Sequence, residues 1–181
     1  SKYISKLEKE TNQSNLKLVD DEINYLKTNI SKIEKIIINN SNSPSLSEWT
    51  NSIKEAKIIL SNLDNFDDIK NSNQNLESLI NKQAQIELAK KQDEENKKQI
   101  KNDANKIMAD LKDYLKEYLT SPQIAPSLLE QIKTLETAIK SDDSNKMKTQ
   151  SQVAKKYIEL EILAPIKKAE EDKRIAEEKR I

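Results

Sequence analysis

The sequence contains no glycine, no cysteine and no histidine among its 181 residues. Without glycine the chain cannot build a Walker phosphate loop or a dinucleotide-binding fingerprint, because both need a backbone that only glycine adopts without strain. Without cysteine and histidine it lacks the usual serine and cysteine triads, and the usual ligands of zinc, haem and iron–sulfur clusters. These absences exclude most enzyme classes, so we expect a protein that is not an enzyme and uses no cofactor or metal.

The charges of the chain balance, with 31 Lys and Arg against 31 Asp and Glu. Basic and acidic residues alternate, and the only arginines are Arg174 and Arg180. A protein that binds nucleic acid needs a basic surface to neutralise phosphates, and this chain has none. Its apolar runs are far shorter than the roughly 20 residues that a transmembrane helix needs. We therefore expect no nucleic-acid partner, no small-molecule substrate and no membrane-spanning segment.

Apolar residues recur at helical spacing along most of the chain. The clearest series has alternating steps of four and three residues, which is a heptad pattern and not the alternation of a strand. Similar series lie within 46–63, 100–118 and 128–139. The pattern predicts an all-α fold. The residues of the first series are Val19, Ile23, Leu26, Ile30, Ile33 and Ile37.

Several residues mark where these helices begin. Ser45 with Glu48, and Ser127 with Glu130, have the spacing of a capping box, and each serine directly follows a proline. Pro165 lies inside the last helical series, where we expect it to kink the helix or to mark a new helix start.

The segment 69–119 contains no helix breaker, although residues 90–99 include no apolar side chain. Such a stretch cannot be packed in a core. Oppositely charged residues nevertheless stand four apart in it, as Asp93 and Lys97 do, which favours a helix. We expect one continuous solvated helix here, and the alternative is a disordered charged linker.

The chain contains an internal repeat. The run Pro44–Glu48 returns as Pro126–Glu130, and Ile33 falls opposite Leu115 at the same offset. The period is roughly 75 to 82 residues, as in tandem helical repeats. Chance similarity between helical sequences is the alternative. The repeat predicts two three-helix units, 1–95 and 96–181, that form an elongated spectrin-like rod and share the long helix.

Trp49 is the one side chain that we single out as a candidate contact residue. It lies on an apolar series near the start of the second expected helix, where an aromatic residue normally belongs to the core. The corresponding residue of the second repeat is Gln131, so the position need not be buried and Trp49 could mark a contact surface. The Tyr114 and Tyr118 pair is expected in the core, and acidic clusters such as Asp142–Asp143 are expected to cap helices.

The composition is biased toward lysine, isoleucine and asparagine, as the run of residues 29–36 illustrates. With the missing glycine and cysteine and the repeated heptad cassettes, the chain resembles surface adhesins of mycoplasma-type bacteria, of the variable adherence-associated antigen type. The resemblance implies a virulence-associated module on the cell surface that attaches to a host-cell protein or glycan. It also implies that the protein is attached to the membrane only through a lipid anchor outside this sequence. We therefore expect the sequence to be part of a longer protein. The alternative function is a structural spacer or scaffold of spectrin-like repeats.

Overall fold

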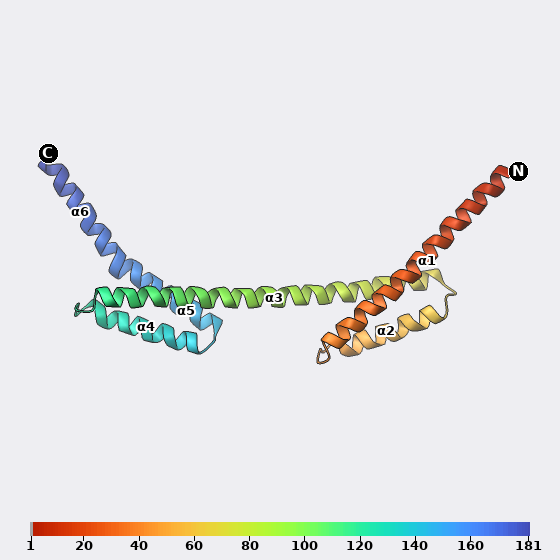
Figure 1. Cartoon of the computed structure of the whole chain (residues 1–181), viewed down its shortest axis with the longest axis horizontal. Helices are drawn as coiled ribbons and strands as arrows, with labels where there is room; N and C mark the ends of the chain where they lie inside the picture. Colours follow the sequence, from red (N-terminus) through yellow and green to blue (C-terminus); the bar gives the residue numbers. More distant parts are fainter. Residues whose placement is uncertain (1) are drawn as a thin grey trace. The chain divides into compact units, whose positions relative to one another are not determined.

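The computed structural model describes residues 2–181, except for the side chain of Tyr3. The described part is helical and contains no strand, which confirms the all-α prediction (Figure 1). Between α5 and α6 lies a short π-helical segment, η1. The elements are α1 Lys2–Asn39, α2 Leu46–Ser61, α3 Phe66–Glu117, α4 Ile124–Lys140, α5 Ser144–Tyr157, η1 Ile158–Leu163 and α6 Ala164–Arg180.

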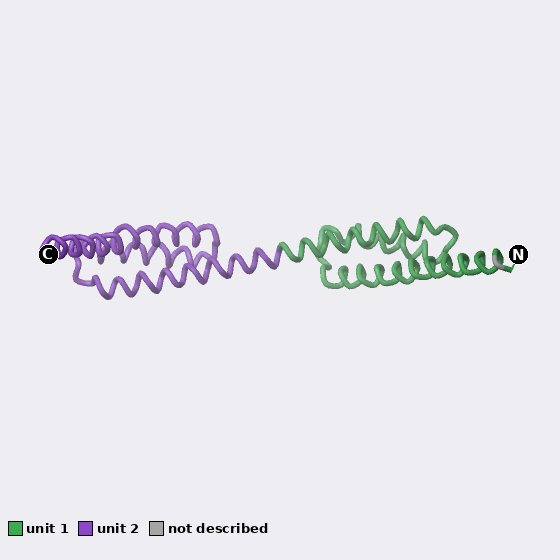
Figure 2. Tube along the Cα trace, turned by 90° about the horizontal axis from the view of Figure 1, so that it is seen from above, with its two compact units in different colours: residues 1–89 green, residues 90–181 purple. Residues whose placement is uncertain are grey.

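The chain divides into two compact units, Ser1–Ala89 and Lys90–Ile181 (Figure 2). The internal repeat predicts this boundary after residue 95. Both positions fall within α3, in a stretch of exposed residues that belongs to neither hydrophobic core. Helix α1 also begins well before its apolar series at Val19, so the N-terminal extension is helical from Lys2.

The core of the first unit forms where α1, α2 and the first part of α3 pack together. Each helix contributes apolar side chains three or four residues apart, which places them on one face. Buried polar groups, Asn29 and Asn73 among them, accompany this core. Its buried apolar residues are Leu26, Ile30 and Ile33 from α1, Trp49, Ile53 and Ala56 from α2, and Ile69, Leu76 and Leu79 from α3.

Trp49 is a core residue of this first unit, with only 3% of its surface exposed. It lies one turn before Ile53 on the buried face of α2. The expectation that this position is only partly buried is therefore wrong, and with it the reason for placing Trp49 on a contact surface. The comparison with Gln131 was misleading because each unit packs its own set of side chains at that level of the bundle.

The second unit has a separate core from the last part of α3, α4 and the run α5–η1. Tyr114 and Tyr118 pack against this core and are partly buried, as the sequence analysis expects. Its buried apolar residues are Ala104, Met108 and Leu111 from α3, Leu128, Leu135 and Ala138 from α4, and Met147, Ala154, Ile158 and Ile162 from α5 and η1.

Helix α3 is continuous through the charged segment, which confirms the prediction of a helix and not a linker. Residues 91–99 are all exposed. Lys97 Nζ lies 2.8 Å from Asp93 Oδ2, one helical turn away. The hydrogen bond and the attraction to this carboxylate raise the pKa of Lys97 above its ordinary value. Local pairing of this kind supports a helix that no core covers.

The two predicted capping boxes are wrong in their roles. Ser45 is the N-cap residue of α2 but its side chain makes no capping bond. Ser43 Oγ instead accepts a hydrogen bond from the Ser45 amide at 3.1 Å. Helix α4 begins at Ile124, before Ser127, whose hydroxyl donates to the Gln123 carbonyl.

Pro126 explains why the start of α4 was misplaced. It is the third residue of the helix, and the first amides of a helix have no partner within it. A proline there therefore costs no hydrogen bond. Ser121 Oγ accepts from the Ile124 amide at 3.3 Å and satisfies one of these free donors.

The acidic pair between α4 and α5 does cap a helix. Asp143 is the N-cap residue of α5, and its Oδ1 accepts from the amides of Asn145 and Lys146 at 3.0 and 3.1 Å. Asp142 has a left-handed backbone with φ of 54° and directly follows Ser141, the C-cap residue of α4. Glycine is the usual residue at this place, and in a chain without glycine an aspartate takes it.

Of the two expectations for Pro165, a kink in the helix or a new helix start, the structure shows a new helix start. Helix α6 begins at Ala164, directly after the π-helical segment that ends at Leu163, and Pro165 is its second residue. Because proline cannot donate the bond that an α-helix interior requires, the wider turn of η1 coincides with the interruption. Further along α6, Arg174 pairs with Glu171 and with Glu178, and the hydrogen bond from Arg174 lowers the pKa of Glu171.

Candidate functional site

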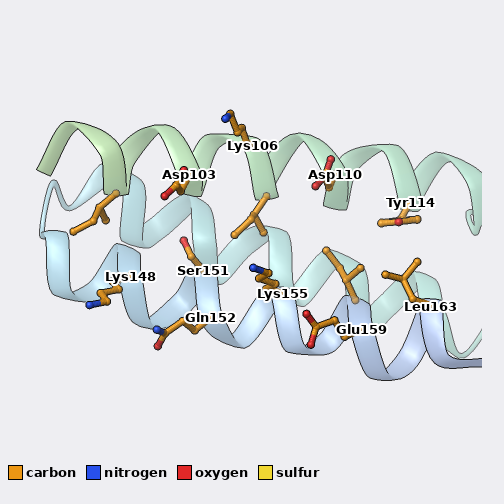
Figure 3. Close-up of a pocket in the computed structure, with 13 residues that line it drawn as sticks. Asp103, Lys106, Asp110, Tyr114, Lys148, Ser151, Gln152, Lys155, Glu159 and Leu163 are labelled. Atoms are coloured by element: carbon orange, nitrogen blue, oxygen red, sulfur yellow. The ribbon is translucent and has the colours of Figure 1, made fainter. Parts of the chain in front are cut away.

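A groove runs along the second unit between α3 and the α5–η1 run, with a cavity volume of about 610 Å³ (Figure 3). It is open to solvent on one side. Its floor is apolar and its edges are charged. The floor consists of Ile100, Ile107 and Tyr114 from α3 and of Ile158 and Leu163 from η1.

The side chains that line the groove repeat every seven residues. On α3 the floor residues Ile100, Ile107 and Tyr114 follow this spacing, and the edge residues are Asp103 and Asp110. Seven residues are close to two helical turns, so residues with this spacing form a row along one side of the helix. The α3 side of the groove therefore presents nearly the same surroundings twice along its length.

The two edges of the groove carry opposite charges. Asp103 and Asp110 line the α3 side, whereas Lys148 and Lys155 line the α5 side (Figure 3). All four residues are exposed. Lys106 also belongs to the lining, but its side chain points away from the groove in Figure 3. Glu159 from η1 also lines the groove, one turn beyond Lys155. An acidic edge on α3 thus faces an edge that is basic along α5 and acidic at its η1 end.

Ser151 lies within the groove and has a buried hydroxyl. The residue is 8% exposed, and its Oγ makes no hydrogen bond in the structure. Figure 3 shows the hydroxyl pointing from α5 toward α3. A buried polar group without a partner destabilises a fold by roughly 1–3 kcal/mol, so such groups are uncommon.

In the first and third helical segments of the two units, most buried residues correspond when residue numbers are shifted by 78. Leu26 corresponds to Ala104, Ile30 to Met108 and Ile33 to Leu111, and all six are buried. For the first helices this register replaces the expected pairing of Ile33 with Leu115. The same shift holds in the third helical segment of each unit, where Ile69 corresponds to Met147 and Leu76 to Ala154. The shift does not hold between α2 and α4, where the buried Ile53 and Ala56 correspond to the buried Leu135 and Ala138 at a shift of 82.

In the first unit the positions that correspond to the groove are joined by hydrogen bonds. Asn73 and Asn29 stand where the second unit has Ser151 and Ile107. Asn29 Nδ2 donates to Asn73 Oδ1 at 3.1 Å. Asn73 Nδ2 donates in turn to the carboxylate and the carbonyl of Glu22, at 2.7 and 2.9 Å. In the first unit, Asn29 and Asn73 thus satisfy each other between α1 and α3. In the second unit, the Ser151 hydroxyl at the corresponding place is left unpaired.

The groove was not predicted from the sequence, and Trp49 plays no part in it because Trp49 lies in the core of the other unit. One signal was present. Ser151 interrupts the apolar series between Met147 and Ala154, and Asp103 and Asp110 have heptad spacing. Sequence alone does not show that Ser151 faces α3 and leaves an unfilled space there.

We expect Ser151→Ala to stabilise the second unit. Removing a buried hydroxyl that has no partner relieves its desolvation cost, so the free energy of unfolding should rise by about 1 kcal/mol. Chemical unfolding followed by circular dichroism measures this change. Thr149→Ala, an exposed change on the same helix, is the control and should stay within about 0.5 kcal/mol of the parent. A loss of stability in the Ser151 variant would mean that the hydroxyl has a partner.

Within residues 2–181, no group of three or more acidic side chains is placed to hold a metal ion. No helix in that part of the chain is long and apolar enough to cross a membrane. Comparison of the chain with models of protein families, with curated proteins and with solved structures finds no match.

Proposed function

We propose that the chain is a non-enzymatic binding module of a bacterial surface adhesin or antigen, which attaches the cell to a host-cell surface protein. The observation that carries the proposal is the groove of the second unit. Its apolar floor is open to solvent and its edges are charged, while Ser151 holds a buried hydroxyl that the chain itself leaves unpaired. These are features of a surface that is completed by a partner.

The floor of the groove favours a protein partner over a glycan. Isoleucine, leucine and tyrosine side chains line it, and burying them requires apolar groups on the partner. The composition and the repeated heptads, which resemble lipid-anchored mycoplasma adhesins, favour a location on the outer cell surface. In this proposal a lipid anchor outside the sequence holds the module at the membrane.

The proposed architecture is a tandem array of spectrin-like three-helix repeats. The register of 78 residues that the first and third helices of the two units share supports a duplication, and the continuity of α3 supports a helix shared between repeats. In such an array each repeat contacts only its neighbours, so the chain would form an elongated rod.

The second candidate function is a structural spacer. The observation in its favour is the exposed segment 91–99 of α3, a stretch of helix whose residues pack against no core. A spacer of this kind needs no binding groove, and its function would be to set the distance between the parts that it connects.

Binding of fluorescently labelled chain to cultured epithelial cells tests the proposal. We expect saturable binding that unlabelled chain displaces. The control is the same titration with chain unfolded in advance, which should show only non-saturable binding. A flat titration with folded chain would overturn the adhesin proposal for this module and favour the spacer.

A further inference from the structure

We propose that the groove binds one amphipathic α-helix of the partner protein, basic along the edge that faces α3 and acidic along the edge that faces α5. The inference rests on the proposed function and specifies the chemistry of the partner. In the complex the incoming helix would lie against α3 and α5 and complete a four-helix arrangement in the second unit.

The seven-residue repeat of the lining is the reason for choosing a helix. Ile100, Ile107 and Tyr114 form one row on α3, and Ser151 and Ile158 stand seven residues apart on the opposite side. A helix with apolar residues at heptad positions meets the same surroundings every two turns, as it does in coiled coils. An extended peptide, whose side chains repeat every two residues, does not match this spacing.

The charges of the edges define the orientation of the bound helix. Asp103 and Asp110 favour lysine or arginine on one side of it, and Lys148 and Lys155 favour glutamate or aspartate on the other. Glu159, at the η1 end of the second side, favours one basic residue there. Reversing a helix exchanges its two edges, so a helix with one basic and one acidic edge fits in only one direction. A small amphiphile with a single charged head group would pair with only one of the two charged edges.

Ser151 adds a polar requirement to the apolar stripe. Its hydroxyl is nine-tenths buried, points into the groove and lacks a partner. In the first unit Asn29 fulfils this need for Asn73 at the corresponding place. The bound helix should therefore carry one asparagine, glutamine or serine in its apolar stripe, which fixes the register as a buried polar residue does in coiled coils.

The first unit does not offer the same site. Tyr25 and Lys32 correspond there to Asp103 and Asp110, so the acidic edge is missing. The Asn29 and Asn73 bridge also joins the two helices across the seam. We therefore expect one helix to bind per chain, at the second unit.

Three synthetic 21-residue helical peptides test the inference against the full chain. All carry leucine at the heptad apolar positions and one central asparagine. The first has lysine along one edge and glutamate along the other, the second has lysine along both, and the third has glutamate along both. Fluorescence anisotropy should show the first peptide binding about tenfold more tightly than either of the others. Several surface ion pairs together are expected to change the dissociation constant by about this factor.

A charge-reversed variant provides the decisive comparison. Asp103→Lys with Asp110→Lys makes both edges basic, and both positions are exposed, so the fold should persist. Its preference should move to the peptide with glutamate along both edges. Asp113→Lys with Glu117→Lys makes the same charge change on exposed α3 residues outside the groove and should leave the preference unchanged.

A second variant closes the groove by transferring the bridge of the first unit. Ile107→Asn with Ser151→Asn reproduces the Asn29 and Asn73 pair, and binding of the mixed-charge peptide should fall at least tenfold while the helical circular dichroism is retained.

Equal affinity for all three peptides, or no change of preference in the charge-reversed variant, would overturn the inference. Displacement of the peptide by dodecanoate at equal concentration would also overturn it, in favour of a small amphiphile. A dimer by light scattering that the closed variant abolishes would overturn it in favour of a second copy of the chain.

Failure of this inference can be distinguished from failure of the proposed function. If the closed variant still binds cells saturably, adhesion stands and the groove is not its contact site. If the peptides bind as expected but the parent chain does not bind cells, the groove takes a helix and the adhesin proposal fails.

Discussion

Replacing Trp49 with alanine should lower the free energy of unfolding of the first unit by about 3–5 kcal/mol, the usual cost of removing a buried large aromatic side chain. The residue is 3% exposed and lies among Ile53, Ala56 and the apolar residues of α1 and α3. The lost side chain leaves a cavity that helices on all sides can fill only in part. Urea unfolding followed by circular dichroism measures the change, because the variant has lost its only tryptophan.

Ile58→Ala is the matched control on the same helix. Ile58 is 57% exposed, so its truncation should change the free energy of unfolding by no more than about 0.5 kcal/mol. Trp49→Phe keeps an aromatic ring and should cost less than the alanine variant. An alanine variant as stable as the parent would contradict a core role for Trp49 and reopen its interpretation as a surface residue.

Replacing Asn73 alone with leucine should destabilise the first unit by about 2–3 kcal/mol, because a buried polar partner would be left unsatisfied. The substitution removes the acceptor of Asn29 and the donor to Glu22. Asn29 is 1% exposed, so water cannot replace the lost acceptor. Thermal or urea unfolding of the single variant measures this cost.

The double variant Asn29→Leu with Asn73→Leu should recover most of that stability. Replacing both members of a buried polar pair with apolar groups leaves no unsatisfied donor inside the core and is often close to neutral. The two changes should therefore be strongly non-additive in a double-mutant cycle. Additive losses from Asn29→Leu and Asn73→Leu would show that the amides act independently and that no buried bridge exists.

The helices could be predicted from the sequence because their signal is local and repeated. The apolar spacing around Leu26, Ile30 and Ile33 holds over several turns, and helix formation depends on such short-range periodicity. The charged segment 90–99 was predictable for a related reason, since pairs such as Asp93 and Lys97 act within one turn.

The serine side chains that accept hydrogen bonds at the helix starts could not be predicted, because several serines lie near each start. Ser45 and Ser127 have the spacing of capping residues, yet Ser43 and Ser121 accept the bonds. The competing serines stand within a few residues of each other, and small differences in backbone direction decide between them. The Asp143 cap was easier to predict because an acidic side chain just before a helix has few alternatives.

The sequence by itself determined the class of the fold and the long solvated helix, since each follows from composition or from spacing along one helix. Only the tertiary structure decided that Trp49 is buried, that Asn29 meets Asn73, and that Ser151 is left unpaired beside an open groove. These facts depend on the distance and rotation between two helices. That geometry is set by the sum of many weak packing contacts among residues distant in the chain, and no local pattern records it.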